Sequence, residues 1–158
     1  MRPFVDGLRR RGFTSKAIDL PTGKAERALP AFHRIVPNRP GVVVGGHSFG
    51  GRVASLAAAE PDAAYEAVVC FSYPLHRPGG HESWDERTAH WPRIRCPVLL
   101  LSGEADPFAR IELLRKAVDR LPRAELVTYP RLGHGVQPVL DDVLDRVAAF
   151  LTGLAGGQ

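Results

Sequence analysis

The sequence predicts one α/β domain built on a parallel sheet of about five strands with flanking helices. Short apolar runs alternate with longer amphipathic runs along the chain, which is the pattern of strands and helices taking turns. The length of 158 residues fits a single domain. With 44% hydrophobic and 24% charged residues, the composition excludes a disordered, collagenous or coiled-coil protein.

The first part of the chain predicts a helix, a strand and a second helix. Residues 3–11 place Phe4, Val5 and Leu8 on one helical face and end before Gly12. Residues 17–20 predict a short strand that ends at a proline. Residues 24–36 have a helical pattern, and Pro30 is the point at which that helix could break.

The middle of the chain predicts a strand, a tight turn, a helix and two further strands. Residues 42–44 are a β-branched run that enters a pair of glycines, and the alanine-rich residues 50–60 predict the helix that follows. Residues 67–71 and 97–102 are nearly all apolar. Such runs are typical of strands that are buried on both faces of a sheet.

The last part predicts a helix, a strand and a long final helix. Asp106 and Pro107 have the residue types of a helix N-cap and a first helical residue. Residues 126–129 predict the last strand, and an apolar stripe over residues 140–151 predicts the last helix. We therefore expect one domain over residues 1–152 and a flexible tail over residues 153–158.

One motif indicates a catalytic site. The pattern G-x-S-x-G, between a predicted strand and a predicted helix, is formed by Gly46, His47, Ser48, Phe49 and Gly50. A serine at this sharp turn is held in a strained backbone, and both motif glycines are expected because a Cβ there would collide with the neighbouring strand or helix. The backbone N–H of Phe49 then faces a developing oxyanion, beside the positive end of the helix.

Other interpretations of this glycine-rich turn fit less well. A dinucleotide-binding fingerprint read from Gly46 requires glycine where Ser48 stands, and a phosphate-binding loop requires a Gly-Lys-Ser/Thr sequence that is absent. A purely structural tight turn remains the alternative.

A serine hydroxyl needs a histidine base, which in turn needs a carboxylate to orient it. Asp106 and His134 come in that order after Ser48, and each follows the carboxyl end of a predicted strand, where open parallel sheets place their sites. The alternatives are that Asp106 only caps a helix, that Glu104 is the acid, and that His134 is a plain loop residue. His47 is the second candidate base, although its side chain should point away from that of Ser48.

The remaining histidines and the two cysteines give weaker evidence of a functional site. His76, His81 and His90 lie in one segment but lack the spacing of a metal site, so we expect no metal. Cys70 and Cys96 adjoin apolar runs and are expected to be buried thiols.

The charge pattern points away from nucleic acid as a partner. The net charge is +4, but the 18 arginines and 3 lysines are scattered rather than gathered in a stripe interleaved with aromatic residues. No apolar run approaches the roughly 18 residues of a membrane span, and the N-terminus does not have the pattern of a secretory signal. We therefore expect a cytoplasmic protein without a membrane partner.

Together these motifs resemble the α/β-hydrolase superfamily, and within it the small cap-less hydrolases related to dienelactone hydrolase. The glycine-rich residues 45–54 and the Tyr-Pro-Leu-His sequence of residues 73–76 resemble a little-characterised bacterial group of that superfamily. The resemblance implies a three-layer α/β/α fold with a mostly parallel sheet and a Ser48, Asp106 and His134 triad. It also implies an open site, a small-molecule acyl substrate and no cofactor.

The sequence departs from the superfamily at its N-terminus. Members usually begin with further strands and a loop that supplies a second oxyanion N–H, whereas this sequence begins at what resembles the helix after that loop. The first strands and the oxyanion loop are therefore missing from the expected pattern. Either Met1 is an internal residue of a longer protein, or residues 17–20 pair directly with residues 42–44 to close the sheet.

Two functions follow as hypotheses. The first is a serine hydrolase that cleaves an ester or thioester through an acyl-enzyme. The alternative is a catalytically weak or inactive binding module, whose exposed apolar strand edges would favour a homo-oligomer or a partner strand.

Overall fold

The computed structural model describes residues 1–156 and contains a four-stranded parallel sheet in the order β1-β2-β3-β4. The strands are Val43–His47, Ala67–Phe71, Val98–Gly103 and Ala124–Tyr129. Because every neighbouring pair is parallel, the carboxyl ends of all four strands lie at one edge of the sheet.

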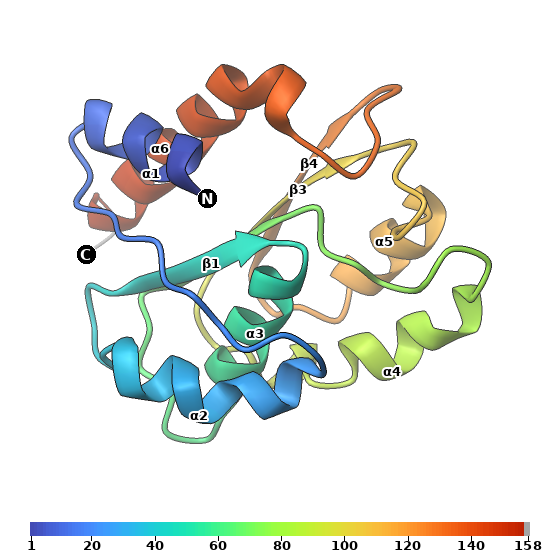
Figure 1. Cartoon of the computed structure of the whole chain (residues 1–158), viewed down its shortest axis with the longest axis horizontal. Helices are drawn as coiled ribbons and strands as arrows, with labels where there is room; N and C mark the ends of the chain where they lie inside the picture. Colours follow the sequence, from blue (N-terminus) through green and yellow to red (C-terminus); the bar gives the residue numbers. More distant parts are fainter. Residues whose placement is uncertain (157–158) are drawn as a thin grey trace.

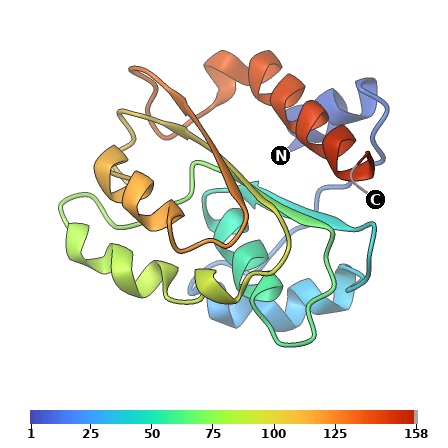
Figure 2. The same cartoon turned by 180° about the vertical axis from the view of Figure 1, so that it is seen from behind.

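Helices cover both faces of the sheet and give the expected three layers (Figures 1 and 2). On one side, α1 packs against α6, and α6 contacts β3. On the other side, α3 packs on β1 and β2 and against α2, while α5 lies against β4 and α4. The helices are α1 Arg2–Arg10, α2 Ala25–Ile35, α3 Phe49–Ala58, α4 Trp84–Thr88, α5 Ile111–Val118 and α6 Leu140–Ala155.

The two central strands explain the apolar runs of the sequence. All side chains of β2 and β3 are buried, and alternate residues face opposite layers. Cys70 and Leu100 join the core beneath α3 and α5, whereas Phe71 and Leu101 join the core beneath α1 and α6. A strand covered on both faces needs apolar residues at every position, and this confirms the interpretation of residues 67–71 and 97–102.

The predicted strand over residues 17–20 is wrong, so the sheet has four strands rather than five. These residues form no ladder and connect α1 to α2 as irregular chain. Ile18 and Leu20 instead pack against the core beneath α2 and α3. Alternating apolar residues satisfy either arrangement, because an extended segment lying on a core also buries every second side chain. The direct pairing of residues 17–20 with residues 42–44 is not formed, and β1 is an edge strand.

Two helices differ from their predicted limits by more than two residues. The helix after β3 begins at Ile111 rather than at Pro107, which leaves Asp106 in a loop. The final helix continues through Gly153 to Ala155, into the segment predicted as a tail. Residues 157–158 of that predicted tail lie outside the described residues.

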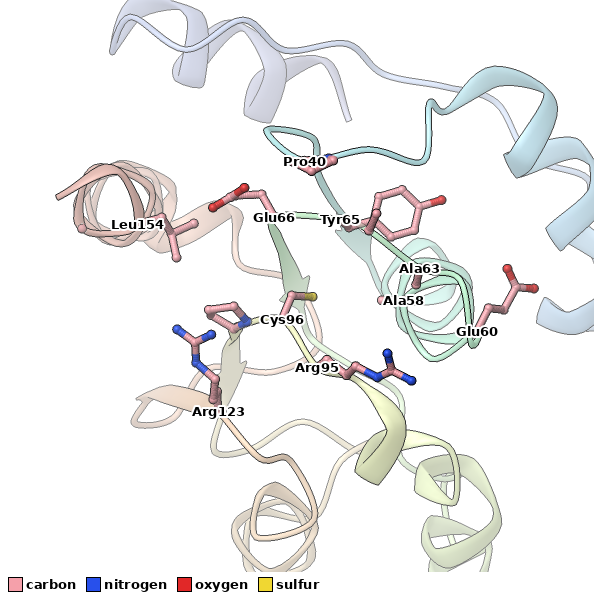
Figure 3. A pocket seen from close by; sticks show the side chains of 13 residues that line it. Pro40, Ala58, Glu60, Ala63, Tyr65, Glu66, Arg95, Cys96, Arg123 and Leu154 are labelled. Atoms are coloured by element: carbon pink, nitrogen blue, oxygen red, sulfur yellow. The ribbon is translucent and has the colours of Figure 1, made fainter. Parts of the chain in front are cut away.

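Two hollows lie away from the carboxyl edge of the strands. An apolar groove of about 940 Å³ follows the free edge of β1 between α1, α2 and α6. A second hollow of about 530 Å³ lies where the strands begin, with Glu66, Arg95, Cys96 and Arg123 among its lining residues (Figure 3). Neither hollow is lined by Ser48.

The two cysteines are free thiols. Cys70 is buried, as predicted, and burial raises the pKa of its thiol to about 12. Cys96 is only partly buried, and burial raises the pKa of its thiol as well. Both groups are therefore protonated near neutral pH. Within residues 1–156, no helix is long and apolar enough to cross a membrane.

Replacement of Pro30 by alanine should stabilise the protein. Pro30 is exposed in the interior of α2, which continues through it unbroken. The proline has no N–H to donate to the carbonyl of Glu26, and its ring crowds that carbonyl. We expect Pro30→Ala to raise the free energy of unfolding by up to about 3 kcal/mol, measured by urea denaturation. Arg34→Ala, at an exposed site of the same helix, is the control and should change it little. A Pro30→Ala protein no more stable than the wild type would contradict this expectation.

His90 should make the protein less stable in mild acid. Its Nε2 lies 2.8 Å from Ser55 Oγ in the core, and burial, with Arg52 and Arg93 nearby, lowers its pKa from 6.5 to about 4. Between these two values the unfolded chain binds the proton more readily, so stability falls as pH decreases through this window. The slope is at most about 1.4 kcal/mol per pH unit.

The test is urea unfolding of the wild type and His90→Gln at pH 7 and pH 5. The wild type should lose more free energy of unfolding than the variant, because glutamine does not titrate. Lys16→Gln, at an exposed site between α1 and α2, is the control and should behave as the wild type. Equal losses in the wild type and His90→Gln would show that His90 does not cause the effect.

Candidate active site

Ser48 lies at the turn between β1 and α3, as the motif predicts. Its N–H donates to the Phe71 carbonyl at 2.8 Å, which extends the ladder, and its carbonyl accepts the Arg52 N–H at 3.2 Å, which begins the helix. The backbone at Ser48 has φ 50° and ψ −111°, a conformation that costs free energy for any residue other than glycine. The same residue thus ends the strand and starts the helix, and this presents its side chain at the sheet edge.

The glycines of the turn have different roles. A Cβ on Gly46 would lie 2.9 Å from Gly50 Cα, where the strand and the helix meet. A Cβ on Gly51 would lie 2.9 Å from the Gly46 carbonyl oxygen. At Gly50, in contrast, a Cβ would meet nothing within 4 Å outside its own helix backbone and chain neighbours. The prediction that Gly50 must be glycine for steric reasons is therefore wrong, and Gly51 takes that part instead.

The three residues Ser48, His134 and Asp106 are joined by hydrogen bonds. His134 Nε2 lies 2.9 Å from Ser48 Oγ, and His134 Nδ1 lies 2.9 Å and 3.0 Å from the two oxygens of Asp106. Since an ionised carboxylate only accepts, the His134 Nδ1–H donates to Asp106. In a neutral ring, Nε2 is then free to accept the hydroxyl proton of Ser48.

Asp106 is buried and is held by its own loop. Its side chain is fully buried, and Oδ1 accepts the Phe108 N–H at 2.8 Å. The residue therefore caps a turn within the loop, and it is not the N-cap of α5, as the simpler interpretation held. The adjacent Ala105 N–H donates to the Leu132 carbonyl at 2.9 Å, which joins the loop of Asp106 to the loop that carries His134.

The other candidate acid and base lie elsewhere. Glu104 accepts a hydrogen bond from Thr128 Oγ1 at 2.7 Å and pairs with Arg115, so its carboxylate is engaged outside the site. His47 Nε2 donates to the backbone carbonyl of His134 at 2.9 Å. His47 therefore supports the loop of His134 and does not face Ser48. Only its position inside the turn motif could have drawn attention to it in the sequence.

The histidines after β2 do not gather in one site. His76 and His81 have their rings 4.6 Å apart, but His90 is bonded to Ser55 on α3. Across residues 1–156, no group of three His, Cys, Asp or Glu side chains is arranged to hold a metal ion.

The start of α3 supplies a favourable position for negative charge. Phe49 is the first residue of the helix, and the first N–H groups of a helix have no partner within it. The positive end of the helix dipole lies at the same place. The N–H of Phe49, next to Ser48 Oγ, is therefore available to bind an oxyanion.

The glycine geometry can be tested by a pair of substitutions. Gly46→Ala should lower the free energy of unfolding by about 1 to 3 kcal/mol, because the new Cβ meets backbone that cannot move separately. Gly50→Ala is the control, and it should leave stability unchanged or raise it by about 0.5 to 1 kcal/mol, as alanine does in a helix. Urea unfolding of both proteins measures the difference. Equal effects would refute the steric account.

Comparisons with known proteins agree with this architecture. The family model of the alpha/beta hydrolase domain matches residues 17–141. The monoacylglycerol lipase of Paleococcus ferrophilus is 17% identical with a TM-score of 0.77, covering 96% of this chain and 88% of that one. An esterase of Pyrococcus furiosus is 19% identical with a TM-score of 0.74, covering 96% of this chain and 73% of that one.

A third similar structure is the dienelactone hydrolase from Anabaena variabilis, which is 27% identical with a TM-score of 0.56. It covers 71% of this chain, which spans 49% of that protein. The first two likenesses are too low in identity to show more than a shared fold, but the family model spans most of the chain. This protein belongs to the α/β-hydrolase family.

Proposed function

We propose that this protein is a serine hydrolase that cleaves an ester or thioester through an acyl-enzyme. The observation that carries the proposal is the hydrogen-bonded chain from Ser48 through His134 to Asp106. These residues come from three loops that follow β1, β3 and β4, at the edge of the sheet where parallel α/β proteins place their active sites.

The mechanism follows from the hydrogen-bond directions. Ser48 Oγ attacks the carbonyl carbon while His134 Nε2 takes its proton, and Asp106 stabilises the imidazolium that forms. The oxyanion binds the Phe49 N–H. His134 then gives the proton to the leaving alcohol or thiol, and the acyl group stays on Ser48. In the second half, His134 deprotonates a water molecule that attacks the acyl carbon. The bond from that carbon to Ser48 Oγ then breaks, the acid leaves, and His134 returns the proton to Ser48 Oγ.

The surroundings of the site support a carboxylic ester or thioester as substrate. The His134 side chain is 24% exposed, so the reacting atoms are reachable from solvent. The segment between β2 and β3 places α4 against α5, and it carries no large lid. Two similar structures are an esterase and a monoacylglycerol lipase, which also favours ester hydrolysis.

A fluorophosphonate probe that labels activated serines tests the proposal. The wild type should be labelled and Ser48→Ala should not, since the nucleophile is gone. Ser83→Ala is the matched control, because the hydroxyl of that serine bonds the Gly80 carbonyl, and it should be labelled as the wild type.

Asp106→Asn should slow ester hydrolysis by about 10⁴-fold, because it favours the wrong tautomer of His134.

Equal labelling of the wild type and Ser48→Ala, or labelling of neither, would reject the hydrolase. Absence of labelling would favour the alternative of a catalytically weak or inactive module that binds a partner. The free edge of β1 is the feature that supports this alternative, since Val43 on that strand is 36% exposed. Analytical ultracentrifugation of the unlabelled protein would then show whether a second copy occupies that edge.

A further inference from the structure

The Tyr-Pro-Leu-His sequence of residues 73–76 forms a buried segment that directly follows β2. All four of its residues are buried, and His76 is only 1% exposed. On one side the segment is tied to α4, because Tyr73 Oη donates to the Arg87 carbonyl and Arg87 Nη1 donates to the Pro74 carbonyl, each at 2.9 Å. Nothing in the mechanism above uses this segment.

On its other side, His76 is bonded to the loop that carries Asp106. The backbone N–H of His76 donates to the Phe108 carbonyl at 3.0 Å, a bond that does not involve the ring. The Arg110 N–H donates to His76 Nε2, also at 3.0 Å. The backbone of residue 76 thus holds Phe108, two residues after Asp106, and the His76 ring holds Arg110, four residues after Asp106.

These bonds select one form of the His76 ring. Nε2 accepts a hydrogen bond from the Arg110 N–H, so it carries no proton itself, and Nδ1 must be the protonated nitrogen. Nδ1 donates to the Arg77 carbonyl at 2.8 Å, which agrees with this assignment. Both ring nitrogens are therefore satisfied in the neutral Nδ1–H tautomer, and a ring protonated at both nitrogens would direct an N–H at the N–H of Arg110.

Phe108 links His76 to the proposed catalytic residues. Its carbonyl accepts from the backbone N–H of His76, and its own N–H donates to Asp106 Oδ1 at 2.8 Å. Its ring packs on His134, with the centroids 4.6 Å apart. A shift of this residue would therefore disturb both the carboxylate and the imidazole.

We propose that His76 is a positioning residue of the active site: its ring, by accepting the Arg110 N–H, fixes the loop of residues 106–110 so that the Asp106 carboxylate stays against His134 Nδ1. The proposal rests on the function proposed above, because it assigns His76 a part in the same reaction. His76 touches no reacting atom, so its removal should lower kcat and leave KM nearly unchanged. A residue that served folding alone would not act through Asp106.

Two substitutions separate the hydrogen bond from the volume of the side chain. His76→Leu has a similar size and no acceptor for the Arg110 N–H, whereas the side-chain oxygen of His76→Gln can accept that bond. We expect kcat for a soluble ester to fall about 10- to 100-fold in the leucine variant, as small misplacements of catalytic groups do. The glutamine variant should recover most of this loss. His33→Leu, at an exposed site on α2, should keep wild-type kcat.

A double-mutant cycle tests whether His76 acts through Asp106. In an Asp106→Asn background, where the carboxylate is already lost, His76→Leu should lower kcat by less than about twofold. The same 10- to 100-fold loss in both backgrounds would overturn the proposal, since the effect would then be independent of the acid.

Imidazole NMR gives a readout that does not need turnover. The nitrogen shifts of wild-type His76 should report the Nδ1–H tautomer. The His134 Nδ1 proton, hydrogen-bonded to Asp106, should be observed in the wild type, His76→Gln and His33→Leu, and lost in His76→Leu. The Nε2–H tautomer at His76, or an unchanged His134 proton in a folded His76→Leu protein, would overturn the proposal. If these NMR results are obtained but the fluorophosphonate probe does not label the wild type, the positioning role of His76 stands and the proposed hydrolase is rejected.

Discussion

The close approach of β1 and α3 at Ser48 is the constraint on which the rest of the site depends. Ser48 makes the last hydrogen bond of the strand with its N–H and the first hydrogen bond of the helix with its carbonyl. The chain therefore changes from strand to helix at this one residue. Gly46 and Gly51 permit this contact, because a Cβ at either position would press on backbone across the turn. The strained backbone of Ser48 is the cost of the arrangement, and the burial of Val53, Ala54, Ala57 and Ala58 on α3 helps to offset it.

The parallel sheet converts a linear order of residues into a cluster. Ser48, Asp106 and His134 each follow a different strand, and parallel strands deliver their following loops to the same edge. This only brings the loops near one another. Their final alignment comes from bonds between loops, namely the Ala105 N–H to the Leu132 carbonyl and the His47 ring to the His134 carbonyl. The sheet thus brings the three loops together, and hydrogen bonds between the loops fix their positions.

The acid loop shows how buried polar groups are kept satisfied in such a cluster. The Asp106 carboxylate is removed from water, and it receives N–H donors from Phe108 and His134 in exchange. The His76 ring accepts the Arg110 N–H of the same loop and donates to the Arg77 carbonyl, so both of its nitrogens are bonded. A buried network of this kind is rigid because the loss of any one partner leaves another group without a hydrogen bond.

The sequence by itself determined the parallel α/β class, the presence and order of the four strands of the sheet, the turn motif and the order of serine, acid and histidine. These follow from local periodicity and from residue types that few other structures need. The tertiary structure alone decided that residues 17–20 lie on the core and form no strand, because their alternating pattern suits both arrangements. It also decided that α5 begins at Ile111, that Gly51 rather than Gly50 must be small, and that the His76 ring bonds the Arg110 N–H. Each of these depends on contacts between segments far apart in the chain, which no local pattern records.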